Sequence, residues 1–350
     1  MMKKKIFFAV ISFIIVLSLG AIFYFNLFDT SGLVYLDKNE QIKCFNSEWK
    51  TLSVVSETGN CYITGERLTN EKNYGIENIR KYNNHPLNQY VQIYDKGDAV
   101  SMNINQYGGT IITKTNDVYV FLNGNDSYRT PTYLCSGYTE AVLGDESKIY
   151  LLSKNGNFGY VTVDKPDDFS LIGQNVTAFK VEYKKSPDSI FVLTKNHNLY
   201  ILKPNETIQS NQNHIDNILD FDVLVPHGNL CVFSIVDDKR DAYVFMRDCE
   251  LTYDNFSNKS LFQKAGKNIS SVTSYDSGIA MMYENGDVAL YGSDFDESPD
   301  NIEFTGEIVF SDVKAAFGGY KNLVLIKSNG EFNYYGKLPD DVRIRITPWT

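Results

Sequence analysis

The chain has 350 residues and a formal net charge of −10, with 43% hydrophobic and 14% aromatic residues. A nucleic-acid surface needs clustered Lys and Arg, so the acidic balance argues against nucleic-acid binding. Tyr (24) and Phe (22) far outnumber Trp (2), and aromatic residues favour strands. The length is sufficient for one large all-β domain.

The first residues differ in character from the rest of the chain. Lys3–Lys5 precede an apolar segment, Ile6 to Phe28, which as a helix would span roughly 34 Å at about 1.5 Å per residue and so cross a bilayer. Basic residues stay on the cytoplasmic side, which places the chain from Asp29 onward outside. The sequence therefore predicts a cytoplasmic stub and membrane anchor over residues 1–28 and an extracytoplasmic domain over residues 29–350.

A cleaved signal peptide is the alternative for this segment. Ser18 and Gly20 are small residues placed before a possible cut at Ala21, as signal peptidase requires. However, Ile22–Phe25 continue the apolar run, which makes the segment long for a signal and favours an uncleaved anchor. Either alternative places the domain outside the cytoplasm.

Cysteine usage fits that compartment, because disulfides persist outside the cytosol. Cys231 lies in NLCVFSIV and Cys249 in AYVFMRDC, with DDKRD between them. A hairpin centred near Arg240 would bring residues whose numbers sum to 480 opposite each other, and such pairs lie within disulfide reach. The spacing thus predicts a disulfide between Cys231 and Cys249.

Cys44 and Cys61 form a second candidate disulfide, with weaker geometric support. Cys135 is left over and is expected to be a buried free thiol. The chain contains no C-x-x-C motif, so zinc and redox sites are not indicated.

Short strand pairs recur along the chain at a nearly constant spacing. The stretch Asp312–Gly336 joins two strand-like runs through a Ser-Asn-Gly turn, and an equivalent unit has Asn285-Gly286 at its turn. Gly accepts the positive φ of tight hairpin turns. The turns fall near residues 116, 156, 197, 240, 286 and 330, at steps of 40, 41, 43, 46 and 44.

A period of about 40 to 50 residues is typical of the blades of a β-propeller. One small sheet cannot bury its faces alone, whereas a closed ring packs each sheet against two neighbours. A long β-sandwich has no reason to repeat at a fixed step. We therefore expect an all-β propeller of about seven blades over residues 29–350, preceded by a single transmembrane helix.

The two C-terminal units resemble the repeat of the regulator of chromosome condensation family. Gly319, Asn322, Gly330 and Gly336 stand at the family's spacings, with Asn where the family has His. The similarity covers roughly residues 107–336, and the family's Gly-Gln-Leu-Gly segment is absent. In the preceding unit only two glycines match: Gly286 and Gly292. The resemblance implies a ring of about seven blades; nucleotide exchange on a nuclear GTPase is not implied for an acidic, extracytoplasmic chain.

No local motif for catalysis or metal binding stands out. The histidines lie far apart in different repeats: His85, His197, His214 and His227. Asp294, Asp296, Ser298 and Asp300 alternate as in a calcium loop, but Pro299 stands where such a loop needs Gly, which favours an exposed inter-blade loop. We expect no catalytic, cofactor-binding or metal-binding residue.

Several Asn residues precede x-Ser/Thr and could be glycosylated in a eukaryotic secretory route. They are Asn125, Asn175, Asn205, Asn255, Asn258 and Asn268. In a sequence so rich in Asn, chance matches are the favoured interpretation.

These features favour a membrane-tethered, monomeric module that binds another protein and is not an enzyme. One specific form would be an immunity-type protein that neutralises a toxin. The alternative is a carbohydrate-active or carbohydrate-binding propeller that uses its central channel. Acids and aromatic residues gathered at one channel mouth would favour the alternative, and a flat face of mixed polarity would favour the binding module.

Overall fold

The computed structural model describes the greater part of the chain beyond residue 32. The described residues are 33–35, 42–48, 51–65, 89–105, 107–122, 127, 130–144, 148–182, 189–203, 205–211, 213–224, 230–248, 257–258, 261–275, 278–292, 308–319, 322–330 and 332–336. Their regular structure is almost entirely β, apart from a short 3₁₀ helix, η4 (Ile208–Ser210). Ile6–Phe28 lie outside the described residues, and no helix within the described ranges is long and apolar enough to cross a membrane.

The strands of the described residues form seven antiparallel sheets, which we name blades A to G. Blade A contains β1 (Leu33–Tyr35), β2 (Ile42–Glu48), β3 (Thr51–Ser56), β4 (Cys61–Gly65) and β5 (Gln89–Tyr94), and blade B contains β6 (Ala99–Asn105), β7 (Gly108–Thr113), β8 (Asp117–Leu122) and β9 (Thr132–Ser136). Blade C contains β10 (Tyr138–Leu143), β11 (Lys148–Ser153), β12 (Phe158–Thr162) and β13 (Lys165–Gly173), and blade D contains β14 (Val176–Glu182), β15 (Ser189–Thr194), β16 (Leu199–Leu202) and β17 (His214–Ile215). Blade E contains β18 (Ile218–Leu224), β19 (Leu230–Asp237), β20 (Ala242–Asp248) and β21 (Gln263–Gly266), blade F contains β22 (Ile269–Tyr275), β23 (Gly278–Tyr283), β24 (Val288–Gly292) and β25 (Ile308–Phe310), and blade G contains β26 (Val313–Gly319), β27 (Asn322–Lys327) and β28 (Phe332–Gly336).

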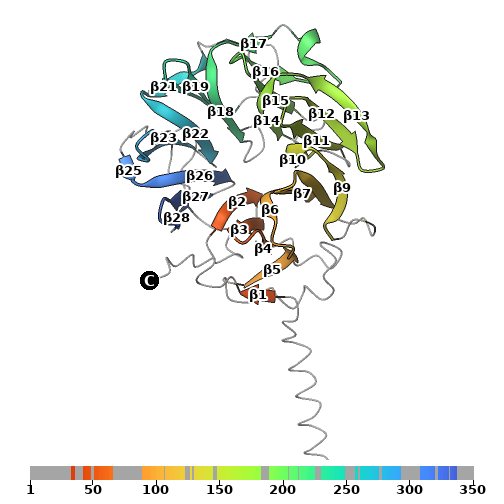
Figure 1. Ribbon diagram of the computed structural model, residues 1–350. Coiled ribbons are helices and arrows are strands. Elements are labelled where there is room, and N and C mark those ends of the chain that lie inside the picture. Colours follow the sequence, from red (N-terminus) through yellow and green to blue (C-terminus); the bar gives the residue numbers. More distant parts are fainter. Residues whose placement is uncertain are drawn as a thin grey trace, which may run out of the picture.

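The seven sheets stand around a common centre like the blades of a propeller (Figure 1). In each blade the strands follow one another outward, and the strands nearest the centre are β2, β6, β10, β14, β18, β22 and β26. β1 departs from this order, because it joins the outer edge of blade A beside β5, with Leu33 opposite Val91. The predicted all-β propeller fold is confirmed.

Each blade has a hairpin turn between its second and third strands, counted outward from the centre, and this turn contains a residue with positive φ. These residues are Gly59, Asn116, Gly156, His197, Arg240, Gly286 and Gly330. Gly reaches this region without strain and Asn tolerates it better than most residues. The hairpin turns expected from the sequence near residues 116 to 330 are therefore confirmed.

The same turns connect neighbouring blades. The carbonyl of His197, in the turn of blade D, accepts a hydrogen bond from the N–H of Ile218 at the start of β18, at 2.8 Å. Gly286 and Val313 repeat the arrangement between blades F and G, also at 2.8 Å. Equivalent bonds join Ala99 to Gly59, Tyr138 to Asn116, Val176 to Gly156 and Ile269 to Arg240. Six of the seven turns are thus fixed in place by the blade that follows them.

Apolar side chains fill every junction between blades. Seven clusters of buried residues each draw members from two adjacent blades, so that each blade face is covered by its neighbour. The cluster between the last and first blades combines Val324 and Ile326 of β27 with Phe45, Leu52 and Val54 of blade A. Since this burial removes apolar surface from water, side-chain packing closes the ring.

The structure corrects the expected pairing of Cys44 with Cys61. Both thiols are free, and β3 lies between them, with Val55 opposite each of the two. Neighbouring strands are about 4.8 Å apart, so the two Cα atoms are separated by about twice that distance, beyond the roughly 7 Å that a disulfide spans. Cys135 is also a free thiol, as the sequence indicated, but it is half-buried rather than buried.

The hairpin that carries Cys231 differs in register from the expected one. Cys231 lies opposite Arg247, so facing residues sum to 478, and the expected centre at Arg240 is displaced. The cross-strand argument for pairing with Cys249 therefore does not hold in this register. Cys249 itself lies outside the described residues, and its disulfide stays a prediction.

Candidate functional site

The inner strands share an irregularity near their first residues. In all seven the register shifts between the first and third residues, which leaves the second as the extra residue of a bulge. These second residues are Lys43, Val100, Thr139, Thr177, Leu219, Ser270 and Lys314. A bulge bends a strand and re-aims the side chains that follow it. From the bulge onward, alternate polar residues of some inner strands reach the next blade: Asp220 at the third position, Asn103 and Asp222 at the fifth and Asn105 at the seventh.

The contacts of these polar side chains with the next blade have a physical reason. The inner edge of each blade carries backbone N–H and C=O groups that no further strand of its own sheet pairs, and buried backbone groups need partners. At the junction of blades B and C, Asn103 Nδ2 donates to the carbonyl of Ala141 at 3.0 Å, and Thr110 Oγ1 donates to the same oxygen at 2.7 Å. Asn105 Nδ2 donates to the carbonyl of Leu143. Side chains thus replace the missing strand.

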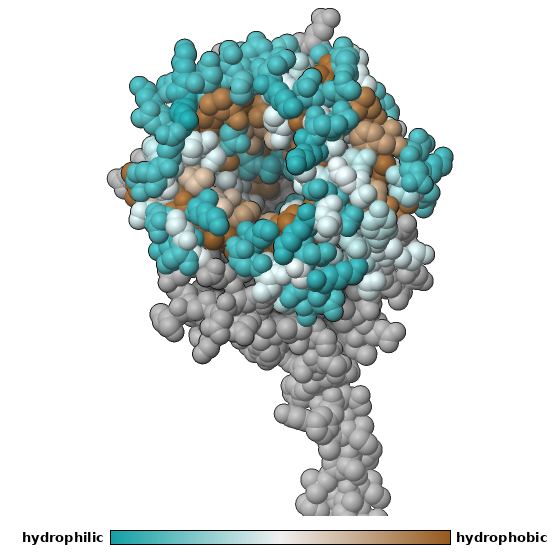
Figure 2. Space-filling view, viewed as in Figure 1, coloured by the Kyte–Doolittle hydropathy of each residue, from teal (hydrophilic) through white to brown (hydrophobic). Residues whose placement is uncertain are grey.

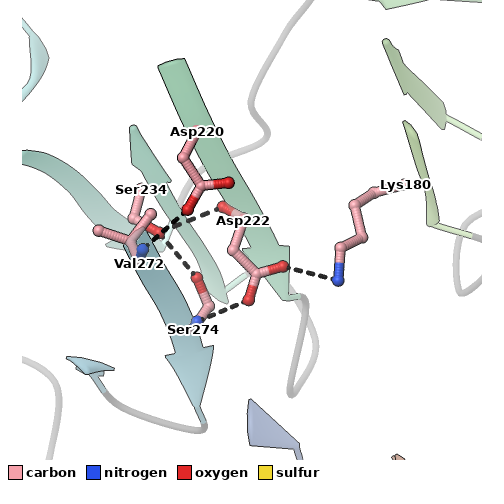
Figure 3. Close-up of polar contacts among 6 residues, drawn as sticks. All are labelled: Lys180, Asp220, Asp222, Ser234, Val272 and Ser274. Carbon is pink, nitrogen blue, oxygen red and sulfur yellow. Dashed lines mark hydrogen bonds and ion pairs between the residues drawn. The ribbon is translucent and has the colours of Figure 1, made fainter. Parts of the chain in front are cut away.

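Two carboxylates do the same between blades E and F (Figure 3). Asp220 Oδ2 accepts a hydrogen bond from the N–H of Val272 at 2.9 Å, and Asp222 Oδ2 accepts one from the N–H of Ser274 at 2.7 Å. The hydroxyls of Ser234 and Ser274 lie 3.2 Å apart in the same junction. These bonds join β18 to β22 through groups that alternate along β18.

Lys180 connects blade D to this group (Figure 3). Its Nζ lies 3.0 Å from Asp222 Oδ1, the carboxylate oxygen that does not bond Ser274. The Lys180 side chain is 52% exposed and that of Asp222 is 11% exposed. Because β14 is an inner strand, this exposure is toward the hollow at the centre of the ring, which Figure 2 shows from one face. Water therefore reaches the cation of the pair.

The cluster formed by Glu140, Lys180, Asp220 and Asp222 contains three acidic side chains and one basic side chain. Removal from water raises the pKa of Glu140 to about 7, although Lys180 opposes the change. The same cause raises the pKa of Asp220 to about 6, and the nearby Asp222 adds to it. Asp222 in turn raises the pKa of Lys180 to about 12. One ammonium group thus faces three carboxyl groups, two of which ionise less readily than usual.

The cluster offers proton-binding groups and charge, but its known contacts are structural. Asp220 and Asp222 bond the backbone of β22, and Lys180 neutralises Asp222. Within the described ranges, no group of three or more His, Cys, Asp or Glu is arranged to hold a metal ion.

The described histidines stand apart from this cluster. His197 occupies an exposed hairpin turn with φ 60°, as expected. His214 lies on the outer strand β17, where its Nε2 is 2.9 Å from Asp216 Oδ1 and its ring is 5.0 Å from that of Tyr200. His85, His227 and the Asp294–Asp300 stretch lie outside the described residues.

Two of the possible glycosylation sequences have a structural explanation. Asn175 and Asn268 take positive φ immediately before an inner strand. Two residues later, Thr177 Oγ1 donates to the carbonyl of Leu193 at 3.2 Å, and Ser270 Oγ donates to that of Met282 at 2.8 Å. The Asn-x-Ser/Thr pattern here meets the needs of a blade junction followed by a bulge, rather than arising by chance as the sequence suggested.

The cluster of Glu140, Lys180, Asp220 and Asp222 was not predicted from the sequence. A signal was present, since Leu219 to Asp222 alternate apolar and acidic residues within a strand-like run. Alternation places both carboxylates on one side of a strand. Neither the bulge nor the identity of the facing blade can be read from that pattern.

The two faces of the ring differ in their connections. On the face with the hairpin turns, blades follow one another after very short links; only Gln174 and Asn175 separate β13 from β14. On the opposite face lie the ends at which third and fourth strands, counted outward from the centre, are connected. The connecting sequence is short between β12 and β13 but long elsewhere, as at residues 66–88, 249–262 and 293–307. We call the first the turn face and the second the loop face.

Comparison with known proteins supports the fold alone. No protein-family profile and no curated protein sequence matches the chain. Among solved structures it is similar to the β-propeller domain of Cps50 (Swd1) from Myceliophteria thermophila, at 10% identity over 87% of this chain and 99% of that chain, with a TM-score of 0.57. It is also similar to a chain of the mitotic checkpoint complex, at 10% identity over 88% and 91% of the two chains, with a TM-score of 0.54.

A third similar structure is Prp20p from Saccharomyces cerevisiae, a homologue of the regulator of chromosome condensation, at 13% identity over 85% of this chain and 83% of that chain, with a TM-score of 0.54. That structure was described together with its binding to Gsp1p and histones. The similarity supports a propeller, a fold commonly used for protein interaction, but does not establish membership of that family.

Proposed function

We propose that this protein is a membrane-tethered, extracytoplasmic propeller that binds another protein through its loop face. The observation that carries the proposal is the unequal distribution of connections: the strand ends joined by long stretches of sequence lie on one face, while tight turns close the other. Loops held by a rigid scaffold are where binding surfaces are most often built.

The use of the channel residues supports binding over catalysis. Asp220, Asp222 and Lys180 are held by contacts between blades, whereas catalytic groups must be available to a substrate. The similar propellers include proteins described in complexes or with binding partners. That analogy is one of fold, and the loop face of this chain supplies its own argument.

The position of β1 is compatible with a tether. Leu33 begins a strand on the outer edge of blade A, and the apolar segment Ile6–Phe28 precedes it closely in the sequence. A chain that enters at the rim leaves both faces of a monomeric ring accessible to a partner.

Two measurements test the tether. After alkaline extraction of membranes from the native host, the protein is expected in the pellet, and mass spectrometry is expected to recover peptides from residues 6–28. A mature chain that begins near Ala21, or release into the soluble fraction, would contradict the proposal.

Crosslinking in intact cells, followed by solubilisation and mass spectrometry, tests the binding face. A partner crosslinked to the wild type should be lost when residues 293–307 are replaced by a short Gly-Ser linker. It should be retained by Lys154→Ala, which changes an exposed residue of the turn face. The reverse pattern, with loss only for the turn-face variant, would contradict binding through the loop face.

A second candidate function is carbohydrate binding or cleavage in the central channel. It is favoured by Glu140 and Asp220, half-buried carboxyl groups whose pKa values are raised to about 7 and about 6, as for groups that act as general acids. Turnover of a glycan that is abolished by Glu140→Gln would favour this function over the binding module.

A further inference from the structure

The seven junctions between inner strands are not held together in the same way. Blades B and C are joined by Asn103 and Asn105, which bond backbone carbonyls, and blades E and F by Asp220 and Asp222, which bond backbone N–H groups. Blades D and E are joined by the ion pair of Lys180 with Asp222. The remaining polar bonds of this kind in the described chain include one from Ile104 N–H to Asn46 Oδ1 between blades A and B.

Blade D is also the blade whose inner strand lies least close to its neighbours. Between β10 and β14 the backbones approach each other less than at any other junction of inner strands, and the approach of β14 to β18 is the next sparsest. By contrast, β18 and β22 lie in the closest contact of the ring. The two sparsest junctions of inner strands thus both flank blade D, and the ion pair of Lys180 with Asp222 lies at one of them, between blades D and E.

The charged surroundings of Lys180 are known from each strand packed near it. Asp222 and Asp220 face it from β18 and Glu140 faces it from β10, and all three interact favourably with its charge. Its own strand also carries Glu182. Because Lys180 is half exposed, dissolved salt screens its attraction to these carboxylates.

We propose that the ring opens at blade D and that the Lys180–Asp222 ion pair holds this blade in the closed position. When the pair separates, β14 moves away from β18 and the wall of the channel opens on the side of blades C, D and E. The E–F junction stays closed, because Asp222 bonds Ser274 through its other carboxylate oxygen.

The rate of amide hydrogen exchange in the full-length protein tests whether the ion pair holds β14 against β18. Lys180→Met removes the cation and keeps an unbranched apolar chain. It is expected to increase exchange severalfold in β14, while β22, whose N–H groups donate to Asp220 and Asp222, keeps its wild-type rate. Raising the salt concentration from about 50 mM to about 1 M, where charges are screened beyond about 3 Å, should accelerate β14 in the wild type and have little further effect in Lys180→Met.

Two further variants serve as controls. Lys180→Arg keeps the charge and is expected to restore slow exchange in β14. Lys195→Met removes an exposed lysine from the hairpin turn of the same blade and should leave β14 unchanged. Equal acceleration of all inner strands by Lys180→Met would show general destabilisation and overturn the proposal, as would unchanged exchange in β14.

Discussion

One backbone angle restricts which residue can precede four of the inner strands, β14, β18, β22 and β26. Asn175, Asn217, Asn268 and Asp312 all take φ near 60° at these positions, a region in which most side chains are strained and Asn and Asp are best tolerated. The need for Asn at these junctions contributes to the high Asn content of the chain. Some of its Asn-x-Ser/Thr sequences therefore have a structural cause, whereas the sequence alone favoured chance.

Asn268 allows a direct test of this account. Asn268→Ala places a Cβ-bearing residue without the local hydrogen-bonding ability of Asn in the left-handed region, and we expect a loss of roughly 1 kcal/mol in the free energy of unfolding. Asn268→Gly should cost less or be neutral, because Gly adopts this φ freely. Urea unfolding of both variants measures the difference, and equal losses would show that the backbone angle is not the cause.

Glu140 gives a prediction about pH. Its pKa is raised from 4.5 to about 7 in the folded state, so between these values the folded protein holds a proton that the unfolded chain has released. The stabilisation from this group is complete below about pH 4.5 and is lost as the pH rises through about 7.

Glu140→Gln mimics the protonated form at every pH. Its free energy of unfolding relative to the wild type should therefore rise between about pH 4.5 and pH 7 and become level above that. Unfolding curves of the two proteins across this range measure the difference. A difference that stays constant with pH would mean that Glu140 titrates normally in the folded state.

At the scale of the element, hairpins were predictable and inner strands were not. Asn-Gly pairs and a constant spacing identify the turns at Gly156, Gly286 and Gly330 because the required angle restricts the residue type. The bulge in each inner strand leaves no such mark, since Lys, Val, Thr, Leu and Ser all occupy it. The register expected at Cys231 was wrong for a related reason. A turn can be located from sequence only to within about a residue, and moving its centre by one residue changes which residues lie opposite each other by two positions.

The packing of β26 on β22 provides a prediction at this scale. A Cβ added at Gly318 would lie 1.9 Å from the carbonyl oxygen of Ser274, a backbone atom that cannot move aside cheaply. Gly318→Ala is expected to destabilise the protein by about 1–3 kcal/mol.

Gly137→Ala is the matched control for that overlap. Nothing lies within 4 Å of a Cβ at Gly137, whose φ is +94°, so the expected cost is only that of the backbone angle, about 1 kcal/mol. The melting temperatures of the two variants compare the effects. A smaller loss for Gly318→Ala than for Gly137→Ala would contradict the close approach of blades F and G.

At the scale of the whole molecule, the repeat predicted the propeller because a ring requires blades of similar length. The sequence did not reveal which inner-strand side chains meet, since Asp220 and Val272 belong to different repeats. Nor did it reveal the closure of the ring, in which residues near the two ends of the described chain, such as Leu52 and Val324, share one cluster.

Leu52→Ala tests this closure. The side chain is 1% exposed and packs in the cluster between blades A and G, so its truncation should cost about 2–5 kcal/mol. Hydrogen exchange should accelerate in β27 of blade G as well as in β3. Acceleration confined to blade A would show that the two blades do not stabilise each other.

The place of β1 has a mechanical consequence. Three residue pairs, from Leu33 with Val91 to Tyr35 with Gln89, hold this strand to the outside of blade A, and removing it leaves β2 to β5 as a four-stranded sheet like those of most other blades. A pulling force on the chain before Leu33 therefore loads this short strand first. β1 is therefore the first strand to detach under tension, and it can be peeled from the rim while the ring keeps every contact between blades.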